Sequence, residues 1–359
     1  MEPIKEALTF DDVLLLPQFS SVVPANTSVN INLSDSINLK LPFISSAMDT
    51  VTESKMAIAM AKNGGIGVIH RNLEMKKQCV EVKKVKRFSL KVGAAIGTSQ
   101  VELIRAKNLI DVGTDMIVID TAHGHSNNVL KMLNKIKKFS KKTTICVGNI
   151  ATGNAAKLLY NSGADILKVG IGPGSICTTR MVAGIGVPQI TALLNVKKAM
   201  HKKKIKIISD GGIKFSGDII KAIAAGADAI MMGSIFAGTK ESPGKIFKLK
   251  KKFYKLYRGM GSIGAMSSGS SERYFQKSYK DKSKFVPEGV ESRVLYKGKV
   301  SKIIYQLQGG LRSSMGYIGA QKLQDVRKKS KFIKITKAGF YESMVHSVET
   351  IKSTINYKL

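Results

Sequence analysis

The sequence predicts an α/β protein in the form of a (β/α)8 TIM barrel, and three observations lead to that prediction. Eight runs rich in Val and Ile recur along the 359 residues, and each is almost continuously apolar, as parallel strands buried on both faces are. Segments of helical period lie between most of these runs. Eight alternating units are the number that closes a barrel, while a doubly wound sheet is the alternative architecture.

The expected strands, in chain order, are residues 42–47, 66–70, 92–97, 116–121, 143–150, 166–172, 205–212 and 229–236. Residues 52–63 illustrate the helices between them, with Thr52 as the cap and Gly64 just past the end. Three Gly-x-Asp triplets are expected to close a helix with a left-handed glycine and then open a strand; they begin at Gly113, Gly163 and Gly226.

Residues 1–359 are expected to form one catalytic barrel domain with a long insertion after the eighth strand. The stretch 240–300 is polar and rich in Gly and Ser, and it fits neither a strand nor a helix of the barrel. A connection of that length in a compact domain is usually functional. We therefore expect a mobile flap within it, at about residues 262–286.

Composition is that of a water-soluble enzyme from a reducing compartment. The apolar fraction of 43% is enough for a large core, and no apolar run is long enough to cross a bilayer. The first ten residues contain Glu2 and Glu6 and no apolar segment of the kind that a secretory signal needs. Only three cysteines occur, which argues against a disulfide framework. We expect a cytoplasmic protein with no membrane association.

The formal charge of +33 raises the question of nucleic-acid binding. The lysines are dispersed in many short groups, as on solvated helix faces, and basic charge alone indicates solubility and non-specific binding. Residues 248–258, where Phe253, Tyr254 and Tyr257 stand among basic residues, are the main support for a nucleic-acid role. The dispersed pattern disfavours that role without removing it as an alternative.

The loop from Gly170 to Arg180 is the strongest candidate for chemistry. Its alternating glycines free the backbone to adopt positive φ angles, and it carries Cys177 among hydroxyl groups. A partly exposed cysteine near positive charge favours the thiolate, which is the nucleophilic form. Cys79 and Cys146 lie in a helix and a strand, where a cysteine is more often a small buried hydrophobe.

Polar side chains at the ends of the expected strands supply candidate ligands, because barrel active sites form at those ends. They are Asp120, Asn149, Asp210 and Ser234. Glycines after strands seven and eight are typical of phosphate binding. His123 and His125 either line the site or belong to a solvated loop, and the histidines and cysteines form no zinc pattern. These residues predict a phosphorylated ligand and covalent cysteine chemistry, and they leave the reaction open.

The loop GPGSICTTR at 172–180 resembles the active-site loop of the inosine monophosphate (IMP) dehydrogenases and the related guanosine monophosphate (GMP) reductases. Further motifs extend the resemblance over nearly the whole chain: LTFDDVLLLP at 8–17, SSAMDTVTE at 45–53, GGIGVIHRN at 64–72, SDGGI at 209–213, YRGMGS at 257–262, SSERYFQ at 270–276, VPEGVE at 286–291 and GGLRSSMGY at 309–317. Taken together, these motifs are specific to the family.

Within this family the resemblance favours the dehydrogenases. Arg273 and Tyr274 look like the hydrolytic flap that the reductases do not use, and the VPEG segment agrees. The dehydrogenases usually carry a regulatory pair of cystathionine-β-synthase-type repeats between strands two and three. Here residues 88–91 lead straight into the next strand, as in the reductases, so that the regulatory insert is absent.

The resemblance implies that Cys177 attacks C2 of the IMP base, that hydride passes to NAD, and that water hydrolyses the adduct with Thr179, Arg273 and Tyr274. The residues implied to bind the nucleotide are Ser46, Met48, Ser175, Asp210, Gly212, Gly233, Ser234, Tyr257, Met260, Gly261 and Glu288. Those on the nicotinamide side are Asp120, Asn149 and Gly170. A potassium ion would bind main-chain oxygens of Gly172, Gly174 and Cys177, completed by Glu342, Ser343 and Met344 of the partner subunit in a homotetramer.

Overall fold

Eight parallel strands close into a barrel in the computed structural model, which describes residues 4–276, 281–348, 354, 356 and 357. The strands are β4 (Phe43–Ser45), β5 (Ile66–Ile69), β6 (Val92–Ile96), β7 (Met116–Asp120), β8 (Thr144–Ile150), β9 (Ile166–Val169), β10 (Lys206–Asp210) and β11 (Ala229–Met232). Pairing of β11 with β4 closes the circle, with Ile230 opposite Phe43. This closure confirms the predicted barrel and excludes the doubly wound sheet.

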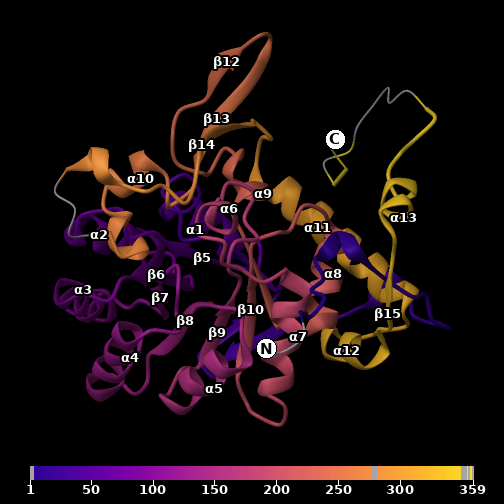
Figure 1. Ribbon diagram of the computed structural model, residues 1–359, viewed down its shortest axis with the longest axis horizontal. Coiled ribbons are helices and arrows are strands. Elements are labelled where there is room, and N and C mark those ends of the chain that lie inside the picture. Colours follow the sequence, from indigo (N-terminus) through magenta and orange to yellow (C-terminus); the bar gives the residue numbers. More distant parts are fainter. Residues whose placement is uncertain (1–3, 277–280, 349–353, 355, 358–359) are drawn as a thin grey trace.

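Helices cover the outside of the barrel because each presents one apolar face to the strands (Figure 1). They are α1 (Ser54–Lys62), α2 (Met75–Lys86), α3 (Gln100–Asp111), α4 (Asn127–Phe139), α5 (Gly153–Asn161), α7 (Gln189–Ala199), α8 (Ser216–Ala225) and α11 (Val300–Tyr317). In α4 the buried residues are Val129, Met132, Leu133 and Ile136, which is the spacing of a single helix face. Residues 87–91 join α2 directly to β6.

The helix predicted at 52–63 is shorter than expected at its start. It begins at Ser54, and the predicted Thr cap is wrong. The Thr52 hydroxyl donates instead to the Ser46 carbonyl oxygen at 2.7 Å, which holds the loop after β4. At the other end Gly64 has φ +91°, as expected. The three triplet glycines are also confirmed as left-handed: Gly113, Gly163 and Gly226 have φ of 86°, 92° and 128°.

Most of the predicted strands end one or two residues early, and two of them end three or more residues early. β9 ends at Val169 because Gly170 turns away with φ +153°, and a Cβ there would meet the Asp210 carbonyl oxygen at 2.1 Å. β11 ends at Met232, and the next residues form the short helix α9 (Ser234–Ala237) rather than more strand. An apolar run as short as that one is equally compatible with a strand and a buried helical turn, so its period did not distinguish them.

The predicted insertion contains more regular structure than its composition indicated. Part of it forms an antiparallel sheet of β12 (Phe247–Leu249), β13 (Lys252–Arg258) and β14 (Glu291–Leu295), which projects from the barrel in Figure 1. The predicted flap contains α10 (Ile263–Ser267), η3 (Ser270–Tyr274) and η4 (Lys282–Lys284). Residues 277–280 of the flap lie outside the described residues.

The remaining elements lie outside the ring of strands. Near the two chain ends, β1 (Val13–Leu15) pairs with β15 (Phe332–Lys334), and β2 (Ile31–Ser34) pairs with β3 (Ile37–Leu39). The other short helices are η1 (Phe10–Asp12), η2 (Pro24–Asn26), α6 (Thr179–Val182), η5 (Leu323–Asp325), α12 (Val326–Lys329) and α13 (Lys337–Glu342). Within the described part of the chain, no helix is both long and apolar enough to cross a membrane.

Candidate active site

A pocket opens at the carboxyl ends of the barrel strands, and most of the predicted site residues line it. Those that do are Ser46, Met48, Asp120, Asn149, Gly170, Gly172, Gly174, Ser175, Cys177, Thr179, Asp210, Gly212, Gly233, Ser234, Tyr257, Met260, Arg273, Tyr274 and Glu288. Gly261 is not among the lining residues, but its carbonyl oxygen accepts the N–H of the lining residue Glu288 at 3.0 Å. Glu342 is the last residue of α13, and Ser343 and Met344 follow it; this helix lies away from the barrel mouth (Figure 1).

Cys177 lies in the loop that follows β9 and faces the pocket. Its N–H donates to the Gly174 carbonyl oxygen at 3.1 Å, which closes a tight turn. The loop is also bonded to the residues that follow the flap, because Thr178 N–H donates to the Glu288 carbonyl oxygen at 2.9 Å. The Cys177 thiol donates to the Thr179 hydroxyl oxygen at 3.2 Å, so that a hydroxyl group lies beside the sulfur.

The other two cysteines have the surroundings of structural residues. Cys146 is fully buried in β8, and this burial raises its pKa to about 12, which keeps the thiol protonated. Burial also raises the pKa of Cys79, which is partly buried on α2. Cys177 is thus the cysteine among the three that combines exposure to the pocket with a polar neighbour.

Arg180 stabilises the cysteine loop through hydrogen bonds to main-chain oxygens. Its Nε donates to the Ile171 carbonyl oxygen at 3.2 Å and its Nη2 to the Val187 carbonyl oxygen at 2.6 Å. A Cβ at Gly172 would lie 2.5 Å from the Arg180 side chain, so glycine is required for this close approach. Burial lowers the pKa of Arg180, and the nearby Cys177 opposes that change. The arginine therefore shapes the loop and contributes positive charge near the sulfur.

Lys168, which the sequence analysis did not identify, connects three of the predicted polar residues. Its side chain is 2% exposed, and Nζ donates to Asp120 Oδ1 and Asp210 Oδ2, both at 2.9 Å, and also to Asn149 Oδ1. Two carboxylates from different strands thus share one buried cation. The available signal was a charged residue within the otherwise apolar strand β9 (Ile166–Val169).

A second group of residues forms a cradle at the ends of β10 and β11. Gly211 and Gly212 both have positive φ, at 89° and 84°, so a side chain would be strained at either position. At Gly233 a Cβ would come within 3.0 Å of the Tyr257 hydroxyl oxygen, which leaves only backbone facing the pocket there. Burial raises the pKa of Tyr257, and the Ser175 hydroxyl partly opposes this. Backbone N–H groups and two neutral hydroxyls at this edge suit a phosphate group.

The flap covers the pocket with Arg273 and Tyr274. Ala122 N–H donates to the Arg273 carbonyl oxygen at 3.2 Å, and the Arg273 guanidinium forms an ion pair with Asp120. Burial lowers the pKa of Arg273; Arg71 adds to this effect, and Tyr274 opposes it. Burial likewise raises the pKa of Tyr274. Both changes favour the neutral side chains, whereas the ion pair with Asp120 favours the charged arginine.

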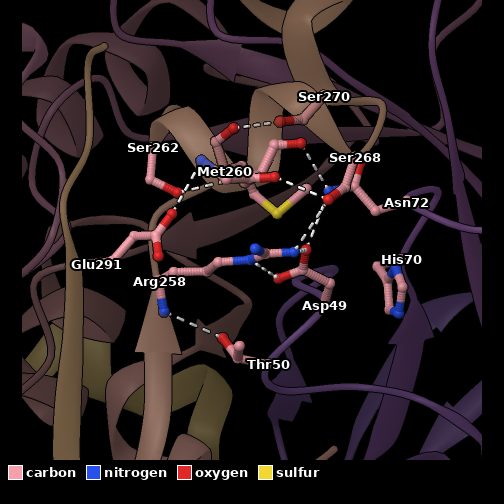
Figure 2. Close-up of polar contacts among 12 residues, drawn as sticks. Asp49, Thr50, His70, Asn72, Arg258, Met260, Ser262, Ser268, Ser270 and Glu291 are labelled. Atoms are coloured by element: carbon pink, nitrogen blue, oxygen red, sulfur yellow. Dashed lines mark hydrogen bonds and ion pairs between the residues drawn. The ribbon is translucent and has the colours of Figure 1, made fainter. Parts of the chain in front are cut away.

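Figure 2 shows the polar cluster that anchors the first part of the flap. Asp49 accepts two hydrogen bonds from Arg258 Nε, both at 3.2 Å, and one from Nη2 at 2.7 Å. Asn72 Nδ2 donates to Asp49 at 3.0 Å and to the Ala265 carbonyl oxygen of α10 at 3.3 Å. The bonds to Asp49 raise the pKa of Arg258, and the bonds of Asn72 tie α10 to the loops after β4 and β5.

His123 and His125 lie beside the pocket rather than in its lining. Their rings meet edge to face with centroids 6.2 Å apart, and burial lowers the pKa of His123. The described residues contain no group of three or more His, Cys, Asp or Glu side chains that could bind a metal ion.

Comparison with known proteins identifies relatives along almost the entire chain. The IMP dehydrogenase / GMP reductase domain matches residues 7–346. The inosine-5'-monophosphate dehydrogenase of Cryptosporidium parvum is 47% identical over 397 residues, which cover 99% of this chain and 98% of the relative. The enzyme of the same name from Borreliella burgdorferi is 46% identical, covering 97% and 98%, and that from Aquifex aeolicus is 40% identical, covering 99% and 98%.

Proposed function

Because the chain belongs to the IMP dehydrogenase / GMP reductase family, we propose that it oxidises IMP to xanthosine monophosphate with NAD, the committed step of guanine nucleotide synthesis. The observation that carries this proposal is that Cys177 lines the same pocket as two groups of ligands. One group is formed by the backbone and hydroxyl groups suited to a phosphate, and the other by Asp120, Asn149 and Lys168. A nucleotide held by its phosphate would bring its base to the cysteine.

The first half of the reaction uses Cys177 as the nucleophile. Its thiolate forms a bond to C2 of the hypoxanthine ring, and the hydride on C2 leaves for the nicotinamide of NAD, so that IMP is oxidised and NAD is reduced. The product is a covalent xanthylate adduct on Cys177. Asp210 binds the ribose hydroxyls in this scheme, and Lys168, 2.9 Å from its Oδ2, holds that carboxylate in place.

The second half hydrolyses the adduct after NADH has left. Water attacks C2, the bond to the Cys177 sulfur breaks, and a base accepts a proton from the water. Arg273 is suited to accept this proton because burial favours its neutral form, and Tyr274, whose pKa burial raises, stays a neutral phenol that can act as its hydrogen-bond partner. Thr179, whose oxygen is 3.2 Å from the cysteine sulfur, and Glu288, which also lines the pocket, offer a second route for the proton.

A direct assay separates this activity from that of the GMP reductases. With IMP and NAD the protein should generate NADH absorbance and xanthosine monophosphate in equal amounts. Consumption of NADPH with GMP and release of ammonia would instead assign the chain to the reductases. Inactivity in both assays, together with salt-sensitive binding of single-stranded nucleic acid, would favour the basic-binder alternative.

Potassium is the cation that we propose for the cysteine loop, bound by main-chain oxygens of Gly172, Gly174 and Cys177 and of Glu342, Ser343 and Met344 of the partner subunit. Gly172 has φ +80°, a conformation that lets such a loop turn its carbonyl groups toward one point. Main-chain carbonyls are suitable ligands for potassium, whose charge would stabilise the shape of the loop. Activity is predicted to be higher in potassium chloride than in sodium or lithium chloride, and equal initial rates in all three salts would contradict the proposal.

We also propose a homotetramer in the cytoplasm. The tetramer would bring the end of α13 and the residues that follow it to the cysteine loop of the partner subunit, and the three cysteines, all free, fit a reducing compartment. Light scattering of the purified enzyme should give the mass of four 38.9 kDa chains. A monomer that remains fully active would contradict both the tetramer and the shared potassium site.

A further inference from the structure

The flap carries an acidic residue, Glu272, next to the proposed catalytic Arg273, and this residue is bound in a socket on the barrel. Its Oε1 accepts the N–H groups of Thr98 at 3.0 Å and Ser99 at 2.7 Å. Its Oε2 accepts the Ser99 hydroxyl at 3.2 Å. These bonds join residues more than 170 positions apart in the chain. A side chain of the flap thus occupies the loop just before α3.

The socket is an anion-binding turn with two carboxylates in it. The N–H groups of residues 97, 98 and 99 all donate to carboxylates, and that of Gly97 donates to Glu102 Oε2 at 2.6 Å. Glu102 belongs to α3 itself, so one position is filled from within the helix and the other two by the flap. Consecutive N–H groups at the positive end of a helix attract negative charge. Ser99 makes no side-chain capping bond to its own helix, which leaves its hydroxyl for Glu272.

Arg71 is a buried cation that favours binding of the Glu272 carboxylate in the socket. Its side chain is 5% exposed, and Nη1 lies 3.9 Å from Glu102 Oε2 and 3.7 Å from Glu272 Oε2. Glu102 already pairs with Arg105, whose Nε donates to it at 2.8 Å. Without Glu272, two arginines would share a single buried carboxylate, and an undercompensated buried charge is costly. Binding of Glu272 restores the balance.

The neighbouring residues connect this contact to the chemistry. Asn72, next to Arg71, anchors α10, as shown in Figure 2. Gly269 lies just after α10 and has φ +129°, a conformation suited to a pivot. Beyond the pivot, Glu272 and Arg273 share one 3-10 turn, Ser270–Tyr274. While Glu272 occupies the socket, Arg273 of the same turn pairs with Asp120 at the pocket.

We propose that Glu272 is a positioning residue, a latch whose carboxylate binds Arg71, Thr98 and Ser99 and thereby sets the fraction of enzyme with the flap closed. The inference rests on the proposed function, because it assigns the latch to the hydrolytic step. Hydride transfer needs the cofactor in the pocket and so does not need the latch. Hydrolysis needs Arg273 in place and therefore follows the closed fraction.

The test compares Glu272→Gln with a matched control, Asp281→Asn. Asp281 also belongs to the flap and is exposed, and its carboxylate bonds only to Ser283 among the described residues. Rapid mixing with IMP and NAD should give Glu272→Gln an undiminished burst of NADH followed by a steady rate reduced about tenfold or more. The control should match the parent. Glu272→Asp, which keeps the charge, should recover part of the rate.

Hydrogen exchange supplies a readout that does not depend on activity. The amide hydrogens of Thr98 and Ser99 should exchange faster in Glu272→Gln than in the parent and in Asp281→Asn. Unchanged exchange there would overturn the latch, and faster exchange with an unchanged steady rate would overturn its role in hydrolysis. A parent enzyme that makes no NADH from IMP would contradict the proposed function instead, while the exchange comparison would still test the latch.

Discussion

The three cysteines differ in what surrounds each sulfur. Cys146 sits inside β8 with its pKa raised by burial to about 12, whereas Cys177 follows a run of glycines and has the Thr179 hydroxyl 3.2 Å away. A buried thiol is a packing group, and a thiol at a pocket mouth is a potential nucleophile. The position of the residue in the fold therefore decides its chemistry.

Cys177→Ala is predicted to abolish turnover while leaving IMP binding within a few-fold of the parent. The reason is that the thiolate forms the covalent bond, while phosphate and ribose are held by other residues. Calorimetry with IMP and a coupled NADH assay measure the two properties separately. Turnover within about tenfold of the parent would contradict covalent catalysis. Cys146→Ser serves as the contrast, because a buried hydroxyl should lower the free energy of unfolding by about 1–3 kcal/mol with the chemical step retained.

The pH dependence of hydrolysis follows from Arg273. Burial lowers its pKa from the ordinary value, so a larger fraction of the side chain is neutral at a given pH. Arginine must be neutral to accept a proton, and hydrolysis should therefore become faster as the pH rises toward that lowered pKa. Decay of the isolated adduct, followed by intact mass at several alkaline pH values, measures this step alone. A decay rate that falls as the pH rises would remove Arg273 as the base.

At the scale of elements, the flap combines an anchored half with a half that binds by few contacts. The anchored half is α10, held by Asn72 and by the cluster of Asp49 and Arg258 (Figure 2). The other half is the turn Ser270–Tyr274, which meets the barrel through Glu272 and Arg273. An arrangement of this kind allows one turn to move while the rest of the sheet and helix stays in place.

Arg273→Ala is predicted to slow hydrolysis far more than hydride transfer. Hydride transfer requires Cys177 and the two substrates, whereas hydrolysis requires a base where the nicotinamide had been. Mixing the variant with IMP and NAD should give one equivalent of NADH per site, then a slow steady rate, with the xanthylate adduct on Cys177 visible by intact mass. If the variant loses the burst itself, Arg273 acts in binding or hydride transfer.

At the scale of the whole molecule, the barrel brings together strands that are distant in the chain. Asp120, Asn149, Lys168 and Asp210 come from β7, β8, β9 and β10, and they meet because the carboxyl ends of neighbouring parallel strands share one edge. The chain passes from α2 to β6 through residues 87–91 alone. A regulatory nucleotide-binding module has no room at that connection.

ATP and GTP at millimolar concentrations are therefore predicted to have no effect through a separate site on this chain. Any inhibition by a purine nucleotide should be competitive with IMP or NAD, because the barrel pocket is the proposed nucleotide site. Initial rates over a grid of both substrates and the nucleotide measure this. A saturable effect that competes with neither substrate would show that an allosteric site exists despite the short connection.

The sequence by itself determined the barrel, most of its strands and the cysteine loop, because these depend on properties that repeat or cluster locally. Runs of Val and Ile predicted the buried strands, and alternating glycines predicted the turn before Cys177. Only the tertiary structure decided that Lys168 joins Asp120 to Asp210, that α9 replaces the end of a predicted strand, and that Glu272 binds the loop before α3. Those outcomes depend on how side chains from remote segments are buried and paired in the folded protein. Contacts between remote segments produce no periodic pattern in the sequence, so the sequence alone does not predict them.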